Sequence, residues 1–128
     1  FSYSPIFFGN DPKAETLGVL RTNNRPGLCV KPWNKGTVVY SAAPLMPARL
    51  IRAIAAHAGV HLYTDQDDLV YANRNYVFIT SRTDGPKKIR LPRTCDVADA
   101  LTEQPLASQV TDVVVEMGRN ETRILALR

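Results

Sequence analysis

The densest group of side chains that could do chemistry in this 128-residue sequence is acidic: Asp65, Asp67 and Asp68 lie within four consecutive positions. A glycoside hydrolase needs two carboxylates about 5–10 Å apart, one of which keeps its proton because its pKa is raised. The same residues also suit a tight turn, where water solvates aspartate and its side chain bonds to the nearby backbone. We predict a turn at this position and no catalytic residue.

Metal binding is the next chemistry that this region could support. A calcium loop that began at Asp65 would need glycine at its sixth position and glutamate at its twelfth, but Val70 is sixth and the twelfth is not glutamate. His57 and His61 flank the end of a predicted helix, yet zinc needs a further ligand and none is close in the sequence. We predict no metal ion, and we expect His57 to interact with the helix dipole.

The two cysteines, Cys29 and Cys95, make neither a metal site nor a disulfide framework. Both lack a local histidine partner and are typical of small buried hydrophobic residues. They fall in different halves of the chain, and a disulfide needs Cα atoms within roughly 7 Å, so we predict two free thiols. The cellular compartment therefore stays open.

Composition and pattern disfavour several other classes of function. The glycines never form the G-x-G-x-x-G loop of a nucleotide site, and no apolar run approaches the roughly 20 residues that span a bilayer. The net charge is +4, but the basic residues are scattered, and their tightest group is predicted to be a solvated face of a strand: Lys87, Lys88, Arg90 and Arg93. We predict no cofactor, no nucleic acid and no membrane partner.

Carbohydrate is the one small ligand that the aromatic residues suggest. Trp33 lies between Pro32 and Asn34 in a turn, where its ring could stack on a sugar. Tyr40, Tyr71 and Tyr76 lie inside apolar strands and are predicted to belong to the core.

A helix over residues 47–58 joins two unlike halves. Pro47 suits the first turn, Leu50 and Ile54 repeat at helical spacing, and Gly59 is a stop signal. Before the helix, strands are predicted at 3–8, 14–20, 28–30 and 37–41. After it, they are predicted at 61–64, 69–72, 76–81, 87–91, 95–101, 110–117 and 122–127.

The second half is predicted to be a small antiparallel β-sandwich. Asp84-Gly85 predicts a hairpin between 76–81 and 87–91, and the glycine-led turn 118–120 predicts a terminal hairpin. Alternation predicts one buried face that contains Tyr76, Phe78, Ile89, Leu91, Val113, Val115, Ile124 and Leu127. The fold class is therefore α+β, mostly β: short antiparallel strands and one helix, followed by a small antiparallel β-sandwich.

The order of several short stretches resembles a known domain over residues 8–60. They are Asp11 with Ala14-Glu15 and Leu17-Gly18, then Gly36-Thr37-Val38-Val39-Tyr40, then Ala58-Gly59-Val60. They are similar to the end of the α/β (flavodoxin-like or amidotransferase-like) domain that follows the catalytic barrel in β-galactosidases and related glycoside hydrolases. The resemblance implies that residues 1–60 are the end of such a domain, which in that family often serves in oligomerisation.

Residues 61–128 resemble the C-terminal β-sandwich that closes many glycoside hydrolases. The resemblance rests on Val70-Tyr71-Ala72-Asn73, Ile89-Arg90-Leu91-Pro92, the segment 96–102 and the closing strand 121–127. Glu103-Gln104-Pro105 departs from the pattern, because a glycine is usual there.

Together these resemblances imply a non-catalytic C-terminal accessory region of a bacterial-type glycoside hydrolase. Its expected partners are the catalytic barrel of a longer parent chain, a second copy of itself, and carbohydrate at Trp33. The self-association surface is predicted at Tyr3, Ile6, Phe7 and Phe8. A carbohydrate-binding module and an unrelated protein-interaction domain are the alternatives. The chain begins at Phe1 without methionine, from which we expect either a piece of a longer protein or a processed chain.

Overall fold

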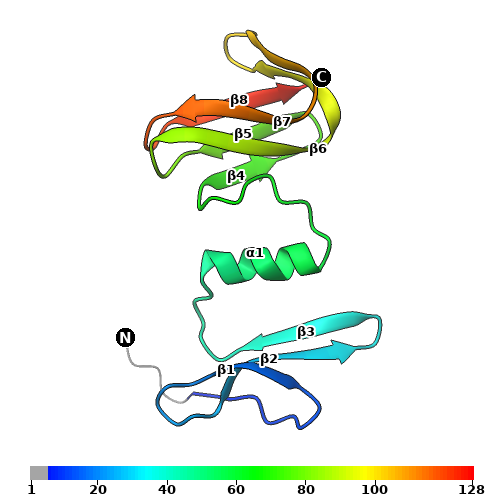
Figure 1. Cartoon of the computed structure of the whole chain (residues 1–128), viewed down its shortest axis with the longest axis vertical. Coiled ribbons are helices and arrows are strands. Elements are labelled where there is room, and N and C mark those ends of the chain that lie inside the picture. Colours follow the sequence, from blue (N-terminus) through cyan, green and yellow to red (C-terminus); the bar gives the residue numbers. More distant parts are fainter. Residues whose placement is uncertain (1–5) are drawn as a thin grey trace. The chain divides into compact units, whose positions relative to one another are not determined.

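The chain divides into two compact units, Phe1–Pro47 and Ala48–Arg128, here called the first and the second unit (Figure 1). The computed structural model describes residues 6–128. Over that range the elements are eight strands and one helix, and every strand pairing is antiparallel. This confirms the predicted fold class, a mostly β protein with one helix.

The first unit is a three-stranded sheet in the order β1-β2-β3. Its strands are β1 (Glu15–Val19), β2 (Pro26–Trp33) and β3 (Gly36–Ser41). Three of the predicted strands in this half are thereby confirmed. Asn34 and Lys35 alone connect β2 to β3, and Asn34 takes the positive φ of 52° that a tight hairpin turn requires.

The predicted strand at 3–8 is wrong where the structure can be compared with it. Residues 6–8 form no strand, and residues 3–5 lie outside the described range. The apolar, aromatic composition of this segment favours a strand, but a strand also needs backbone hydrogen bonds to a neighbouring strand. Gly9 donates its N–H to the Pro26 carbonyl (2.9 Å), which ties this segment to the sheet one residue after the predicted strand.

The helix α1 (Ala48–His57) agrees with the prediction to within one residue at each end. It ends in a Schellman motif: the Val60 N–H bonds to the Ala55 carbonyl (2.9 Å) and the Gly59 N–H to the Ala56 carbonyl (3.0 Å). Gly59 has the positive φ of 74° that this cap needs. The helix is amphipathic, yet none of its residues is buried.

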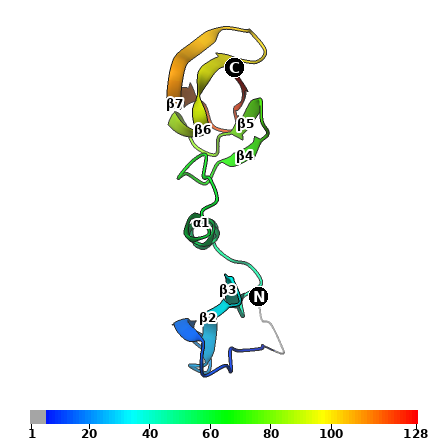
Figure 2. The ribbon, with the colours of Figure 1, turned by 90° about the vertical axis from the view of Figure 1, so that its right-hand side faces the viewer.

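The second unit continues with a five-stranded sheet in the order β4-β5-β8-β6-β7. Its strands are β4 (Leu69–Ala72), β5 (Tyr76–Thr80), β6 (Gly85–Asp99), β7 (Pro105–Met117) and β8 (Thr122–Leu127). The β6–β7 ladder shifts register between Arg90 and Cys95, and beyond the shift β6 also pairs with β8. The sheet therefore wraps around its own interior, as Figure 2 shows.

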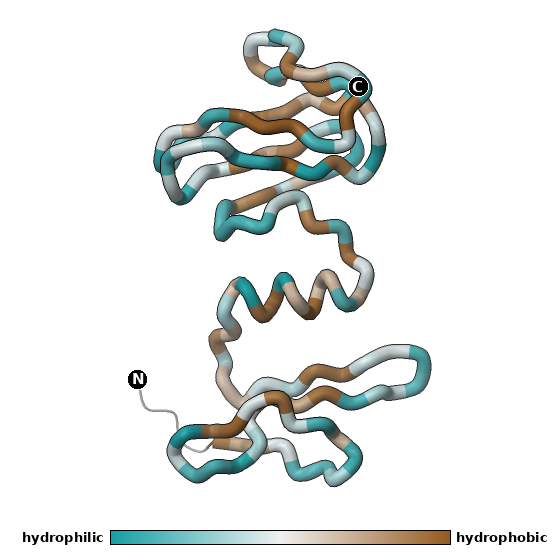
Figure 3. The backbone as a smooth tube through the Cα atoms, viewed as in Figure 1, coloured by the Kyte–Doolittle hydropathy of each residue, from teal (hydrophilic) through white to brown (hydrophobic). Residues whose placement is uncertain are grey.

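That interior holds the hydrophobic core. Residues from the first half of β6 and from β5 belong to the same buried cluster, as expected of two facing layers. The cluster is Val77, Ile79, Ile89, Leu91, Cys95, Val97, Val113, Val115, Met117, Leu125 and Leu127. Figure 3 shows hydrophobic residues recurring along these strands, and also along those of the first unit.

Both predicted hairpins in this half are wrong. β8 lies between β5 and β6, so the Asp84-Gly85 turn connects strands that are not neighbours. Likewise, β7 and β8 do not pair with each other, although each pairs with β6. The Asp84-Gly85 turn does form, since Gly85 has the positive φ of 108° that was expected. A turn reverses the chain, but it does not determine whether a third strand lies between the two strands that it connects.

The number and ends of the strands also differ from the prediction. Residues 61–64 form no strand, and five strands replace the seven expected. β6 passes through Pro92, although the strand predicted at 87–91 stops one residue before it. Pro92 lies in the irregular stretch between Arg90 and Cys95, where the β7 ladder is interrupted, so its missing N–H breaks no regular hydrogen bond.

The buried face of β5 is one residue out of phase with the prediction. Val77 and Ile79 are fully buried, at 0% exposure, whereas Tyr76 and Phe78 are 41% and 37% exposed. A shift of one residue exchanges the two faces of a strand. The other predicted core positions on β6, β7 and β8 are buried, apart from Ile124, which is half-buried.

The two units meet at Pro47, whereas the predicted domains meet at residue 60, so the helix belongs to the second unit here. Whether residues 1–60 descend from an α/β domain stays a prediction.

Candidate functional site

The sugar-stacking candidate Trp33 ends β2 and is 59% exposed. Lys31 lies two positions earlier in the strand, and its Nζ is 5.4 Å from the centre of the Trp33 ring. The same ammonium forms an ion pair with Asp11. The pKa of the Asp11 carboxyl is lowered, first by the hydrogen bond that the Lys31 ammonium donates to it and then by one from the Lys13 N–H.

These side chains border a surface hollow of about 220 Å³. Val38 and Tyr40 of β3 are opposite Lys31 and Cys29 of β2, so all four belong to one face of the sheet. The hollow combines an aromatic ring, apolar walls and an ion pair able to bond to hydroxyl groups. A sugar ring would stack on the free face of Trp33 or displace Lys31.

The predicted self-association segment is exposed over the part that the structure describes. Ile6, Phe7 and Phe8 are all exposed, Phe7 the most at 74%. The Arg25 guanidinium lies 5.2 Å from the centre of the Phe8 ring. Tyr3 lies outside the described residues.

Each aspartate of the acidic turn is paired with a different basic residue. Asp65 binds both terminal nitrogens of Arg90, and Asp67 binds Arg52 of α1. The hydrogen bonds from these guanidinium groups lower the pKa of both carboxyls. A catalytic proton donor needs the opposite, a raised pKa.

Lys87 was predicted to lie on a solvated face, and this is wrong: its side chain is 1% exposed. Its Nζ donates to Gln66 Oε1 (2.7 Å) and Thr83 Oγ1 (2.8 Å), and lies 3.4 Å from Asp68 Oδ1. The Asp68 side chain is equally buried, and its Oδ2 has no hydrogen-bond partner among residues 6–128.

The sequence carried a signal for this buried ion pair. Lys87 has the same phase along β6 as Ile89 and Leu91, which were both predicted to be buried. Lys88 and Arg90 have the opposite phase, and Arg93 lies in the irregular stretch between Arg90 and Cys95; all three are exposed, as predicted.

An exposed aromatic strip, formed by Tyr71, Tyr76 and Phe78, was missed because these residues were assigned to the core. Tyr71 is 73% exposed and pairs with Phe78 across β4 and β5. The rings of Tyr76 and Phe78 are 6.5 Å apart. Tyr40 is half-buried.

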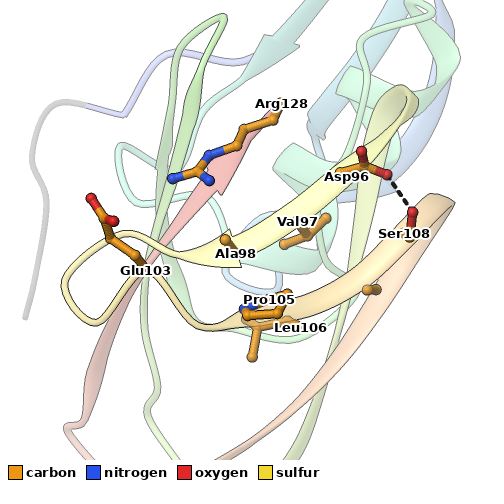
Figure 4. A pocket seen from close by; sticks show the side chains of 9 residues that line it. Asp96, Val97, Ala98, Glu103, Pro105, Leu106, Ser108 and Arg128 are labelled. Carbon is orange, nitrogen blue, oxygen red and sulfur yellow. Dashed lines mark hydrogen bonds between the residues drawn. The ribbon is translucent and has the colours of Figure 1, made fainter.

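The second unit has a larger hollow, of about 530 Å³, between the outer parts of β6 and β7 (Figure 4). Asp96 Oδ1 accepts hydrogen bonds from Ser108 Oγ (2.7 Å) and the Gln109 N–H (2.8 Å), which lower the pKa of Asp96. The neighbouring walls, Val97 and Ala98, are apolar. The carboxylate is therefore engaged by β7 and links β6 to β7 beside the irregular part of their ladder.

The remaining candidate residues are the two histidines and the two cysteines. His57 is in the last turn of α1, and His61 Nε2 is 3.1 Å from the Arg90 carbonyl. Cys29 and Cys95 are free and buried, as predicted. Residues 6–128 contain no group of three or more His, Cys, Asp or Glu that could hold a metal ion. In the same range no helix has the length and apolar character needed to cross a membrane.

The chain was compared with protein families, curated proteins and solved structures, and only the solved structures gave a match, which concerns the fold. No family model matches the sequence, and no curated protein matches it. Among solved structures, the chain is similar to a β-galactosidase from Bacillus circulans sp. alkalophilus, with a TM-score of 0.57 and 20% sequence identity. The similarity covers 91% of this chain and 18% of the β-galactosidase, so the chain corresponds to a small part of that enzyme's length.

Proposed function

We propose that this chain is a non-catalytic accessory and assembly region of a glycoside hydrolase related to the β-galactosidases. The observation that supports this most directly is the extent of the structural similarity. Nearly all of this chain is similar to a β-galactosidase, while most of that enzyme has no counterpart here. A chain of this kind completes, orients or assembles an enzyme whose reaction takes place in another domain.

The side-chain chemistry supports a role without catalysis. Glycoside hydrolysis needs one carboxyl group that keeps its proton near neutral pH. In the acidic turn, Asp65 and Asp67 are instead held ionised by Arg90 and Arg52. Asp96 is held in the same way by Ser108 and Gln109.

The first unit supports the assembly role. It exposes Ile6, Phe7 and Phe8 next to a sheet with hardly any core, and apolar surface of this kind usually marks an interface. In this proposal the segment that also contains Tyr3 binds either the catalytic barrel of the parent chain or a second copy of the protein.

Two measurements on the purified chain test the proposal. We expect no hydrolysis of an aryl β-galactoside or β-glucoside; turnover that is lost in Asp65→Asn or Asp67→Asn would overturn the accessory role. We also expect light scattering to show an oligomer that Ile6→Lys with Phe8→Lys weakens. Leu101→Lys with Val114→Lys is the matched control, because it adds the same charge to exposed apolar residues of the second unit.

Carbohydrate binding is a second candidate, favoured by the exposed Trp33 at the edge of a hollow with the Lys31–Asp11 ion pair. Titration with galactose-containing oligosaccharides should then quench Trp33 fluorescence, since this is the single tryptophan of the chain. Asp11→Ala should weaken the binding, while Tyr71→Ala should leave it unchanged. A chain whose fluorescence does not respond to millimolar sugar would exclude this candidate.

A further inference from the structure

The outer edge of β3 presents backbone groups that no residue between 6 and 47 uses. β2 and β3 pair with Lys31 opposite Val38 and Cys29 opposite Tyr40, and the Ala42 N–H bonds to the Gly27 carbonyl (2.7 Å). In an antiparallel ladder the residues that bond to the neighbouring strand alternate with residues that point away from it. The N–H and C=O groups of Thr37, Val39 and Ser41 therefore face the open edge. Pro32, opposite Thr37, agrees with this phase because it has no N–H to donate.

The other sheet edges carry features that discourage pairing with another strand. β1 has two register shifts within five residues, and β4 has only four residues. β7 contains Pro105, an irregular ladder and two acidic residues, Asp112 and Glu116. β3 has none of these features: its sequence GTVVYS is uncharged, its ladder with β2 is regular, and it is rich in β-branched residues. An edge of this kind is a template for a further strand.

We infer that β3 pairs in antiparallel fashion with β3 of a second copy of this chain, across a two-fold axis next to Val39. The inference adds a second surface to the assembly role proposed above, distinct from the segment 6–8, and rests on that role. In this register Val39 is opposite Val39 of the second copy, and Thr37 is opposite its Ser41. All three edge-facing residues of each copy thereby find a partner, which joins two three-stranded sheets into one of six strands.

The side chains are complementary in the same register. Val38 of one copy is opposite Tyr40 of the other, twice over, and pairs of aromatic and β-branched residues stabilise neighbouring strands. The basic turns lie at opposite ends of the joined strands. Lys35 is opposite position 43 of the second copy, so the two Lys35 residues are eight residues, about 27 Å, apart along the strand direction. This exceeds the Debye length of about 8 Å at physiological salt, and their repulsion is largely screened.

Cysteine cross-linking of the full chain tests this register. Val39→Cys places two thiols opposite each other, with Cα atoms about 5.5 Å apart, within the range for a disulfide. Thr37→Cys is the matched control in the same strand, because its two copies would be about 14 Å apart. With oxidised glutathione as the oxidant, we expect a disulfide-linked dimer in Val39→Cys at a rate at least about tenfold above that of Thr37→Cys. The unmodified chain, whose two cysteines are buried, gives the background.

Light scattering of the unmodified chain completes the test. A dimer at tens of micromolar, together with selective cross-linking at position 39, supports the inference. Equal cross-linking at positions 37 and 39, or a monomer at high micromolar concentration, overturns it. A dimer without cross-linking at position 39 that dissociates in Ile6→Lys with Phe8→Lys also overturns it, but leaves the assembly role intact. Hydrolysis of an aryl glycoside by the chain would instead refute the accessory role and has no bearing on β3.

Discussion

The two units use similar strands but differ in what covers their sheets. In the second unit, β6 and β7 are long enough to bend, so one sheet closes over a cluster of eleven buried hydrophobic residues. In the first unit, three strands form an open sheet, and Cys29 is the one buried residue between positions 6 and 47. Several large apolar side chains of the first unit remain exposed, among them Phe7, Leu17, Val19, Trp33 and Val38.

This difference shows which unit carries its own stability. A small sheet needs a covered hydrophobic face to be stable in water. The second unit provides that cover itself, through the bend of β6 and β7. The first unit has apolar residues in strand order but nothing within residues 6–47 that covers them, so we expect its stability to come from a partner.

Separating the two units is the strongest test of this difference in stability. We expect residues 48–128 alone to unfold cooperatively, at nearly the temperature seen for the same unit in the full chain. Residues 1–47 alone should show no cooperative transition, because so little apolar surface is buried. Circular dichroism melts of the two fragments check this, and a cooperative melt of 1–47 at low micromolar concentration would contradict it.

The two buried cysteines report on the stability of each unit in the intact chain. Cys29 becomes reactive when the first unit opens locally, whereas Cys95 needs the core of the second unit to open. We expect Cys29 to react at least roughly 100-fold faster, which corresponds to about 2.7 kcal/mol in opening free energy. Mass spectrometry after native alkylation measures both rates, and labelling in denaturant should count two thiols. Equal native rates would mean that the units are equally stable.

A pair of substitutions in β5 tests the core of the second unit. Ile79→Ala should cost about 2–5 kcal/mol of unfolding free energy, because Ile79 is fully buried in the closed sheet. Phe78→Ala, one residue away on the outer face, should cost about 1 kcal/mol or less. Urea denaturation of both variants measures the difference. A larger loss for Phe78→Ala would restore the register that the alternation alone predicts.

The buried ion pair gives a further contrast with the exposed pairs. Asp68→Ala leaves Lys87 buried without its carboxylate, which should cost about 3 kcal/mol, the lower end of the range for breaking a buried pair. The lower end applies because Gln66 and Thr83 still accept hydrogen bonds from Lys87. Asp67→Ala, which breaks the exposed pair with Arg52, should leave the denaturation midpoint almost unchanged. Adding Lys87→Met to Asp68→Ala should recover part of the loss.

The smallest expected effect is on the stability of the fold at acidic pH. Ser108 and Gln109 lower the pKa of Asp96 below its usual 3.8 in the folded chain. The ionised carboxylate therefore stabilises the fold above pH 3.8, and this contribution is lost as the pH falls through the lowered pKa. Ser108→Ala should reduce stability at pH 7 and make the loss between pH 5 and pH 2 shallower, as thermal melts across that range would show. An unchanged pH profile would mean that Ser108 does not hold the ionised form.

Local signals in the sequence were enough for the elements whose stabilising contacts are close along the chain. The helix, its glycine cap and the strands β2 and β3 each depend on residues within a few positions, and each was predicted near its observed place. The buried thiols were also predictable, since cysteine without a histidine partner favours the core. The pairing of Asp65 and Asp67 with Arg90 and Arg52 needed the structure, because the partners are 25 and 15 residues away.

By itself, the sequence determined the places of the helix and of most strands and turns, because propensity, capping and alternation act over a few residues. The tertiary structure decided which strands are neighbours in the sheet and which side chains are buried. Insertion of β8 between β5 and β6 cancelled two predicted hairpins, and the closed core buried Val77, Ile79 and Lys87 while it exposed Tyr76 and Phe78. These outcomes depend on contacts between residues that lie far apart along the chain, and no local pattern specifies them. Alternation separates the two faces of a strand, but the packed partner decides which of them is the inside.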